Sequence, residues 1–144
     1  MKTINFIVVL LISSVMLCAA QSKPKVKTDT VSSKTGLKYL ILKKGTGAPS
    51  KAGQEVLIFE TASYASGKVL FSNENTDRPI KVLIGGHQAT DGEDEGLHGM
   101  QVGEVRKMFI PNYLCRRSSY PPNISPDSPI VVKVILHKIL NNTK

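Results

Sequence analysis

The chain has 144 residues, 41% of them apolar and 6% aromatic, and it contains no tryptophan. This length leaves room for one domain with a single hydrophobic core once the first segment is set aside. The formal net charge is +8, but the basic residues are scattered, without an arginine cluster or interleaved aromatic residues, which argues against a nucleic-acid-binding protein.

Residues 1–20 have the pattern of a secretory signal peptide. Lys2 precedes an apolar run from Phe6 to Leu17, which is too short to span a bilayer comfortably, and residues 18–20 are small and suit cleavage before Gln21. We therefore expect an exported protein, in the periplasm or cell envelope of a bacterium or in the secretory pathway of a eukaryote. A lipidated Cys18 is the alternative, and it would tether the chain to a membrane as an envelope lipoprotein.

Residues 21–35 are polar, rich in Lys, Ser and Thr, and predict a flexible linker between the signal and the domain. Cleavage of the signal would leave Cys115 as the only cysteine, so no intrachain disulfide is expected. Cys115 follows an apolar strand, and we expect it to pack as a small hydrophobic residue.

Alternating apolar and polar residues predict strands that are separated by turns, and one segment predicts a helix. The expected strands are residues 36–43, 56–61, 68–71, 80–84, 105–110 and 130–139. The expected helix is Asp91–Met100, with Asp91 as its N-cap and with Leu97 and Met100 on one apolar side. Residues 112–129 predict a long, proline-rich loop. This order predicts an α+β domain in which a curved antiparallel sheet wraps one short helix.

Residues 95–111, which read E-G-L-H-G-M-Q-V-G-E-V-R-K-M-F-I-P, resemble the helix-turn-strand element of the FKBP-type peptidyl-prolyl cis-trans isomerases. The opening G-L-K-Y at 36–39 and the strand P-I-K-V-L-I-G at 79–85 are similar to the same family. Residues 36–144 are therefore identified as an FKBP-type domain. The resemblance implies a rotamase, an isomerase that assists protein folding and here would act on exported chains.

The resemblance also implies a substrate groove, which this family builds mainly from aromatic side chains around an acidic residue. Here Glu93 stands where the family has a tryptophan floor, Glu60 replaces a tyrosine, and Phe71 replaces the acidic residue. An ion pair of Arg116 with Glu93 or Glu60 across the groove is one hypothesis. The full set of implied groove positions is Glu60, Leu70, Phe71, Ile80, Ala89, Thr90, Glu93, Arg116, Tyr120, Ile124 and Val132.

Prolyl isomerisation faces a barrier of about 18–20 kcal/mol and requires neither a nucleophile nor a cofactor. An apolar groove can favour the twisted amide, which is less dipolar than the planar one. Because charged residues occupy groove positions, we expect a family member with weak or lost turnover whose partners are proline-containing polypeptides. The alternative is a non-catalytic module that binds a peptide or a partner protein. The three histidines are widely spaced, so no metal site is expected.

Overall fold

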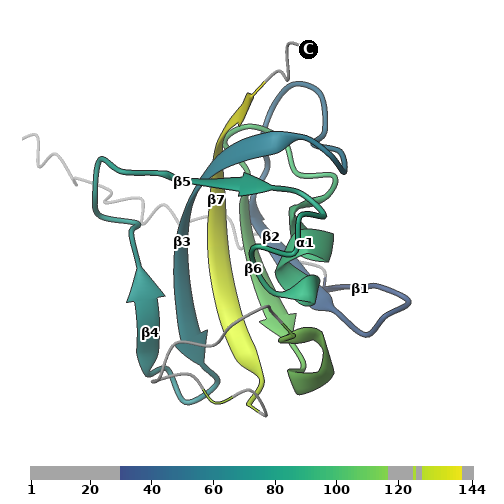
Figure 1. Ribbon diagram of the computed structural model, residues 1–144, viewed down its shortest axis with the longest axis vertical. Coiled ribbons are helices and arrows are strands. Elements are labelled where there is room, and N and C mark those ends of the chain that lie inside the picture. Colours follow the sequence, from purple (N-terminus) through teal and green to yellow (C-terminus); the bar gives the residue numbers. More distant parts are fainter. Residues whose placement is uncertain (1–29, 117–124, 126–127, 141–144) are drawn as a thin grey trace, which may run out of the picture.

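The computed structural model describes residues 30–116, 125 and 128–140. In this part of the chain, seven antiparallel strands form one sheet in the order β1-β2-β6-β7-β3-β4, and β5 pairs with β3 beside β4 (Figure 1). The predicted α+β class is confirmed, with one short helix. The strands are β1 (Thr30–Ser32), β2 (Lys38–Lys43), β3 (Glu55–Tyr64), β4 (Val69–Ser72), β5 (Ile80–Leu83), β6 (Val105–Ile110) and β7 (Ile130–Leu140), and the helices are α1 (Asp91–Leu97) and the 3-10 turn η1 (Asn112–Leu114).

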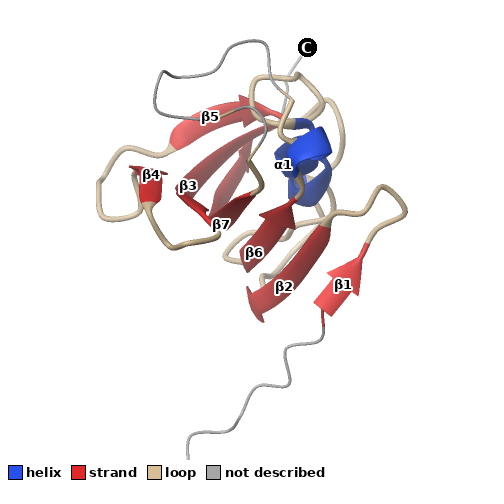
Figure 2. Cartoon of the chain, turned by 90° about the horizontal axis from the view of Figure 1, so that it is seen from below, coloured by secondary structure: helices blue, strands red, loops and turns tan. Residues whose placement is uncertain are grey.

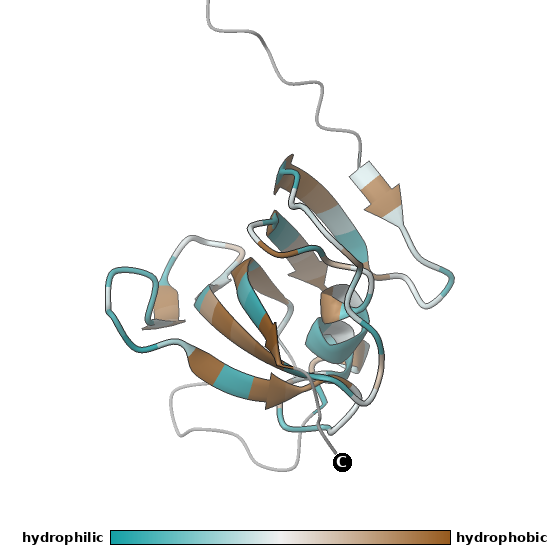
Figure 3. Cartoon of the chain, turned by 90° about the horizontal axis from the view of Figure 1, so that it is seen from above, coloured by the Kyte–Doolittle hydropathy of each residue, from teal (hydrophilic) through white to brown (hydrophobic). Residues whose placement is uncertain are grey.

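Strands β3, β7 and β6 form the centre of the sheet, and their alternation defines its two faces. Val132, Val134 and Leu136 of β7 are buried, whereas the residues between them are only partly buried. Successive side chains of a strand point to opposite faces, so one face carries the core. Figure 3 shows apolar and polar residues alternating along the strands. We call the buried side of the sheet the core face and the other side the outer face.

Helix α1 packs directly on β6, and two glycines permit the close approach (Figure 2). A Cβ atom placed on Gly96 would lie 1.9 Å from Met108 Sδ, and one placed on Gly92 would lie 2.5 Å from Ile110 Cγ2. A larger residue at either position would require Met108 or Ile110 to move. The start of α1 is therefore fixed above the end of β6, where Ile110 pairs with Ile130.

The helix boundaries differ from the prediction at both ends. Thr90, not Asp91, is the N-cap, because its extended backbone lets Oγ1 accept a hydrogen bond from Glu93 N at 3.2 Å. The helix ends at Leu97 rather than Met100, since Gly99 takes a left-handed φ of +79° and reverses the chain. Met100 is nevertheless fully buried, as the apolar pattern required.

The polar segment before the domain also differs from the prediction within the described residues. Thr30–Ser32, expected to belong to a flexible linker, forms strand β1 along the free edge of β2.

The strand β3 runs beyond its predicted end to Tyr64, because β7 offers hydrogen-bond partners along that whole length. The proposed signal peptide lies outside the described residues. Within the described chain, no helix combines the length and apolar character needed to cross a membrane.

Candidate functional site

Strand register brings several of the implied groove positions onto the core face. Ala62 of β3 pairs with Phe71 of β4 on one side and with Val132 of β7 on the other. Glu60 pairs with Val134, which is fully buried, so the Glu60 side chain leaves the sheet on the same face. Phe71, Glu60 and Val132 therefore share the core face.

The remaining described positions lie around the same face. Leu70 and Ile80 are partly buried and pack against the core, and Ile80 pairs with Ile58 of β3. Ala89 and Thr90 are buried just before α1, and Glu93 is buried in its first turn. Tyr120 and Ile124 lie outside the described residues, so their groove positions stay predictions.

Glu60 has the least satisfied side chain of this group. Its Oε2 atom is buried and has no hydrogen-bond partner in the described structure. Its backbone N–H is satisfied, because it donates to Asn73 Oδ1 at 2.7 Å. A buried polar atom without a partner is unfavourable, and a charged one more so. The core face therefore holds a buried carboxylate oxygen close to Val132 and Val134.

Asn73 is a positioning residue that the sequence analysis did not identify. It is buried, and its Nδ2 donates to Arg78 O at 2.9 Å while its Oδ1 holds Glu60 N. Its carbonyl oxygen accepts a hydrogen bond from Thr76 Oγ1 at 2.8 Å. These bonds tie the loop between β4 and β5 to the strand that carries Glu60. An asparagine at a strand end is a common turn residue, and this was the available signal.

The hypothesised ion pair of Arg116 with Glu93 or Glu60 does not form among the described residues, where Arg116 is exposed. Its carbonyl oxygen accepts a hydrogen bond from Asp91 N at 3.1 Å, and its groove position stays a prediction. The neighbouring Cys115 points inward instead and is 3% exposed. Cys115 is the C-cap of η1, and its backbone N–H donates to Asn112 O at 3.0 Å.

Cys115 packs in the core, as expected for a small hydrophobic residue. Its Sγ donates to Pro111 O at 3.3 Å. Burial raises the pKa of its thiol above the usual value, against a smaller opposing effect from the backbone at Ile130. The thiol is therefore protonated and unreactive at neutral pH. Among the described residues, no cluster of three or more His, Cys, Asp or Glu side chains is arranged to hold a metal ion.

Residues 47–137 match the family model of the FKBP-type peptidyl-prolyl cis-trans isomerases. The chain is 30% identical to the chloroplastic peptidyl-prolyl cis-trans isomerase FKBP16-3 of Arabidopsis thaliana over 85% of its own length, but it spans only 58% of that relative. FkpA from Escherichia coli has a TM-score of 0.69 at 27% identity, with 80% of this chain and 53% of that one covered. AtFKBP13 has a TM-score of 0.67 at 24% identity over 78% and 99% of the two chains, a likeness of fold alone. From the fold and these matches together, the chain belongs to the family of FKBP-type peptidyl-prolyl cis-trans isomerases.

Proposed function

We propose that the core face binds prolyl peptides and isomerises them slowly, so that the chain is a weak peptidyl-prolyl isomerase acting on exported proteins. Membership of the family supports the substrate class and the reaction. The observation that supports slow turnover is the buried, unpartnered Oε2 of Glu60 on the face that would receive the proline ring. Burial of Glu93 at the start of α1 supports the same conclusion.

The physical reason lies in the difference between the planar and the twisted amide. The planar amide is more dipolar, so a dry apolar surface favours the twisted transition state. An aromatic side chain contributes about 150–250 Å² of surface, which at about 25 cal/mol per Å² corresponds to roughly 4–6 kcal/mol for complete burial. Loss of a third of one such contact in the transition state, about 1.4 kcal/mol, slows the reaction about tenfold. Carboxylates at positions 60 and 93 remove contacts of this kind.

The test is a prolyl isomerisation assay with a short proline-containing peptide, in which cis-trans exchange is followed by NMR so that no coupling protease is needed. We expect the full chain to accelerate exchange weakly, and the double variant Glu60→Tyr with Glu93→Trp to raise kcat/KM at least tenfold. Glu55→Tyr is the matched control, because Glu55 starts the same strand but forms an ion pair with Lys81 away from the groove positions. Fast exchange by the natural chain, with no gain in the double variant, would refute slow turnover.

A non-catalytic binding module is the second candidate, and the exposure of β4 favours it. Phe71 and Val69 are 43% and 57% exposed, so β4 presents two large apolar side chains that a bound peptide could cover. Under this alternative a proline peptide binds at equilibrium without faster exchange, and Phe71→Ser weakens binding while the melting temperature stays the same. Binding that persists in Phe71→Ser would exclude this role for β4.

Export is proposed from the sequence of residues 1–20. Mass spectrometry of the mature protein distinguishes the two routes: cleavage before Gln21 supports secretion, whereas a chain that begins with a lipid-modified Cys18 supports a membrane tether. A mature protein that retains Met1 would contradict both.

A further inference from the structure

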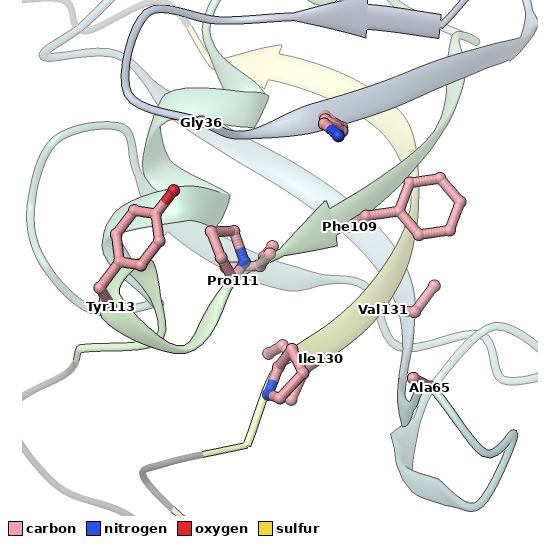
Figure 4. A pocket seen from close by; sticks show the side chains of 10 residues that line it. Gly36, Ala65, Phe109, Pro111, Tyr113, Ile130 and Val131 are labelled. Atoms are coloured by element: carbon pink, nitrogen blue, oxygen red, sulfur yellow. The ribbon is translucent and has the colours of Figure 1, made fainter.

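A pocket of about 470 Å³ lies where β6 ends and β7 begins, and none of the groove positions lines it. Phe109 of β6 and Val131 of β7 pair with each other there and point away from the core, since their neighbours Met108 and Val132 are buried. Figure 4 shows Phe109 and Tyr113 on opposite sides of this hollow, with Pro111 between them. We call it the outer pocket.

The wall opposite Phe109 is held in place by a close contact. Tyr113 of η1 lies against Gly36, where a Cβ atom would be only 2.1 Å from Tyr113 Oη. Gly36 also has a φ of +96°, so a residue with a side chain is disfavoured for two reasons. The tyrosine is 52% exposed even though its ring is seated against the backbone. The outer pocket is therefore a concave apolar site whose rim carries an accessible phenol.

Two lysines give the outer pocket a positive charge. Lys38 of β2 lines it and pairs with Phe109 in the register, and Lys107 Nζ lies 5.6 Å from the centre of the Phe109 ring. Neither lysine forms an ion pair with any residue that the structure describes. The register partner of Lys107 is Lys133, whose Nζ already pairs with Glu74. No described acidic group thus lies within ion-pair distance of Lys38 or Lys107.

We propose that the outer pocket binds an acidic peptide segment of a partner protein, with one aromatic side chain in the hollow and carboxylates beside Lys38 and Lys107. A volume of about 470 Å³ accommodates a large side chain, and complementary charge would orient the segment. A concave hollow suits an inserted side chain, whereas a lipid surface is met by protruding apolar residues. A second copy of the chain, which has a net charge of +8, would be repelled.

The test uses a proline-free probe, so its outcome is independent of prolyl turnover. The peptide acetyl-Asp-Glu-Phe-Asp-Glu-amide is titrated into the isotope-labelled full chain, and the amide NMR signals are followed. We expect the signals of Lys38, Lys107 and Phe109 to shift and that of Glu60 to stay, with affinity falling as salt is raised. The same peptide with lysines in place of its acidic residues should not bind.

Charge reversal locates the site. The double variant Lys38→Glu with Lys107→Glu should weaken binding at least tenfold, while Lys51→Glu, an exposed lysine in the turn before β3, should leave it unchanged. Circular dichroism checks that each variant is folded. Equal weakening by Lys51→Glu would mean that only overall charge attracts the peptide, and shifts centred on Glu60 would place the peptide in the groove. Either of these results would overturn the proposal. Absence of binding at millimolar peptide would also overturn it, as would binding to phosphatidylserine vesicles without binding to the peptide.

Discussion

Arg106 is a buried cation that ties the C-terminal end of α1 to β6, and we expect its removal to lower the stability of the fold. Its side chain is 5% exposed, and its Nη2 and Nε atoms bind Glu104 Oε1 at 2.6 and 2.8 Å. Nη1 donates to Gly96 O at 2.7 Å and to His98 O at 3.3 Å, carbonyls at the end of the helix. The guanidinium also lies 4.2 Å from the centre of the Tyr39 ring. One side chain thus satisfies a carboxylate and a helix terminus.

The substitution Arg106→Ala leaves the Glu104 carboxylate buried without its cation, together with two helix carbonyls that lose their donor. Breaking a buried ion pair in this way costs about 3–5 kcal/mol. The Glu104 Oε2 atom keeps one bond, from Gln101 N at 3.1 Å, so the lower half of that range is the better estimate. The double substitution Arg106→Met with Glu104→Gln removes both charges and should cost less than Arg106→Ala alone, because no unpaired charge stays buried.

Urea unfolding followed by circular dichroism measures this effect. With a slope of about 1–3 kcal/mol per molar urea, a loss of about 3–4 kcal/mol moves the midpoint down by more than about 1 M. Lys138→Ala, an exposed lysine on β7, is the control and should change stability by less than about 0.5 kcal/mol. A cost below about 1 kcal/mol for Arg106→Ala, or a double variant less stable than the single one, would show that the buried pair does not anchor the helix.

Three further predictions concern the core and the surface. Gly96→Ala should cost about 1–3 kcal/mol in a thermal melt, because its Cβ would lie 1.9 Å from Met108 Sδ; an unchanged Tm would mean that the methionine moves freely. The Lys133 hydrogen bond holds the pKa of Glu74 below its usual value, so its stabilisation is present above the unfolded-state pKa and disappears as pH falls through the folded-state pKa. Lys133→Met should therefore cost up to about 1 kcal/mol near pH 7 and nothing near pH 2, which urea titrations at both pH values check. Buried Cys115 should react with a disulfide reagent at least 100-fold more slowly in the folded chain than in urea, and equal rates would contradict its burial.

The central strands could be predicted because their alternation is strong and local. β6 and β7 begin and end close to where the residue pattern placed them, and Pro111 stops β6 as proline does at a strand end. The short strand β1 could not be predicted, since its Thr-Val-Ser sequence becomes a strand only through the free edge of β2. The N-cap at Thr90 was missed because threonine and aspartate are both good caps; in the structure Thr90 Oγ1 accepts from Glu93 N.

The positions of the candidate site came from the resemblance, because nothing in the residue pattern alone marks them. The register of β3 and β7 then places Glu60 and Val132 on one face. The segment after β6 was expected to be loop, whereas it begins with the 3-10 turn η1. Cys115 is buried as expected, and Arg116, which the resemblance alone placed in the groove, is exposed. The role of Asn73 could not be predicted either, because it depends on hydrogen bonds that form only when its loop returns to β3.

The alternation along β6 makes the two proposed binding surfaces separable. Arg106 and Met108 point to the core face and support α1, whereas Lys107 and Phe109 point to the outer face. A strand assigns each residue to one face, so a change at Lys107 should weaken binding of the acidic peptide without altering prolyl exchange. A change at Glu60 should alter prolyl exchange without weakening binding of the acidic peptide. If Lys107→Glu also changed the exchange rate, the two surfaces would be coupled through β6. Such coupling requires movement of the strand itself, which the bonds of Arg106 to the helix oppose.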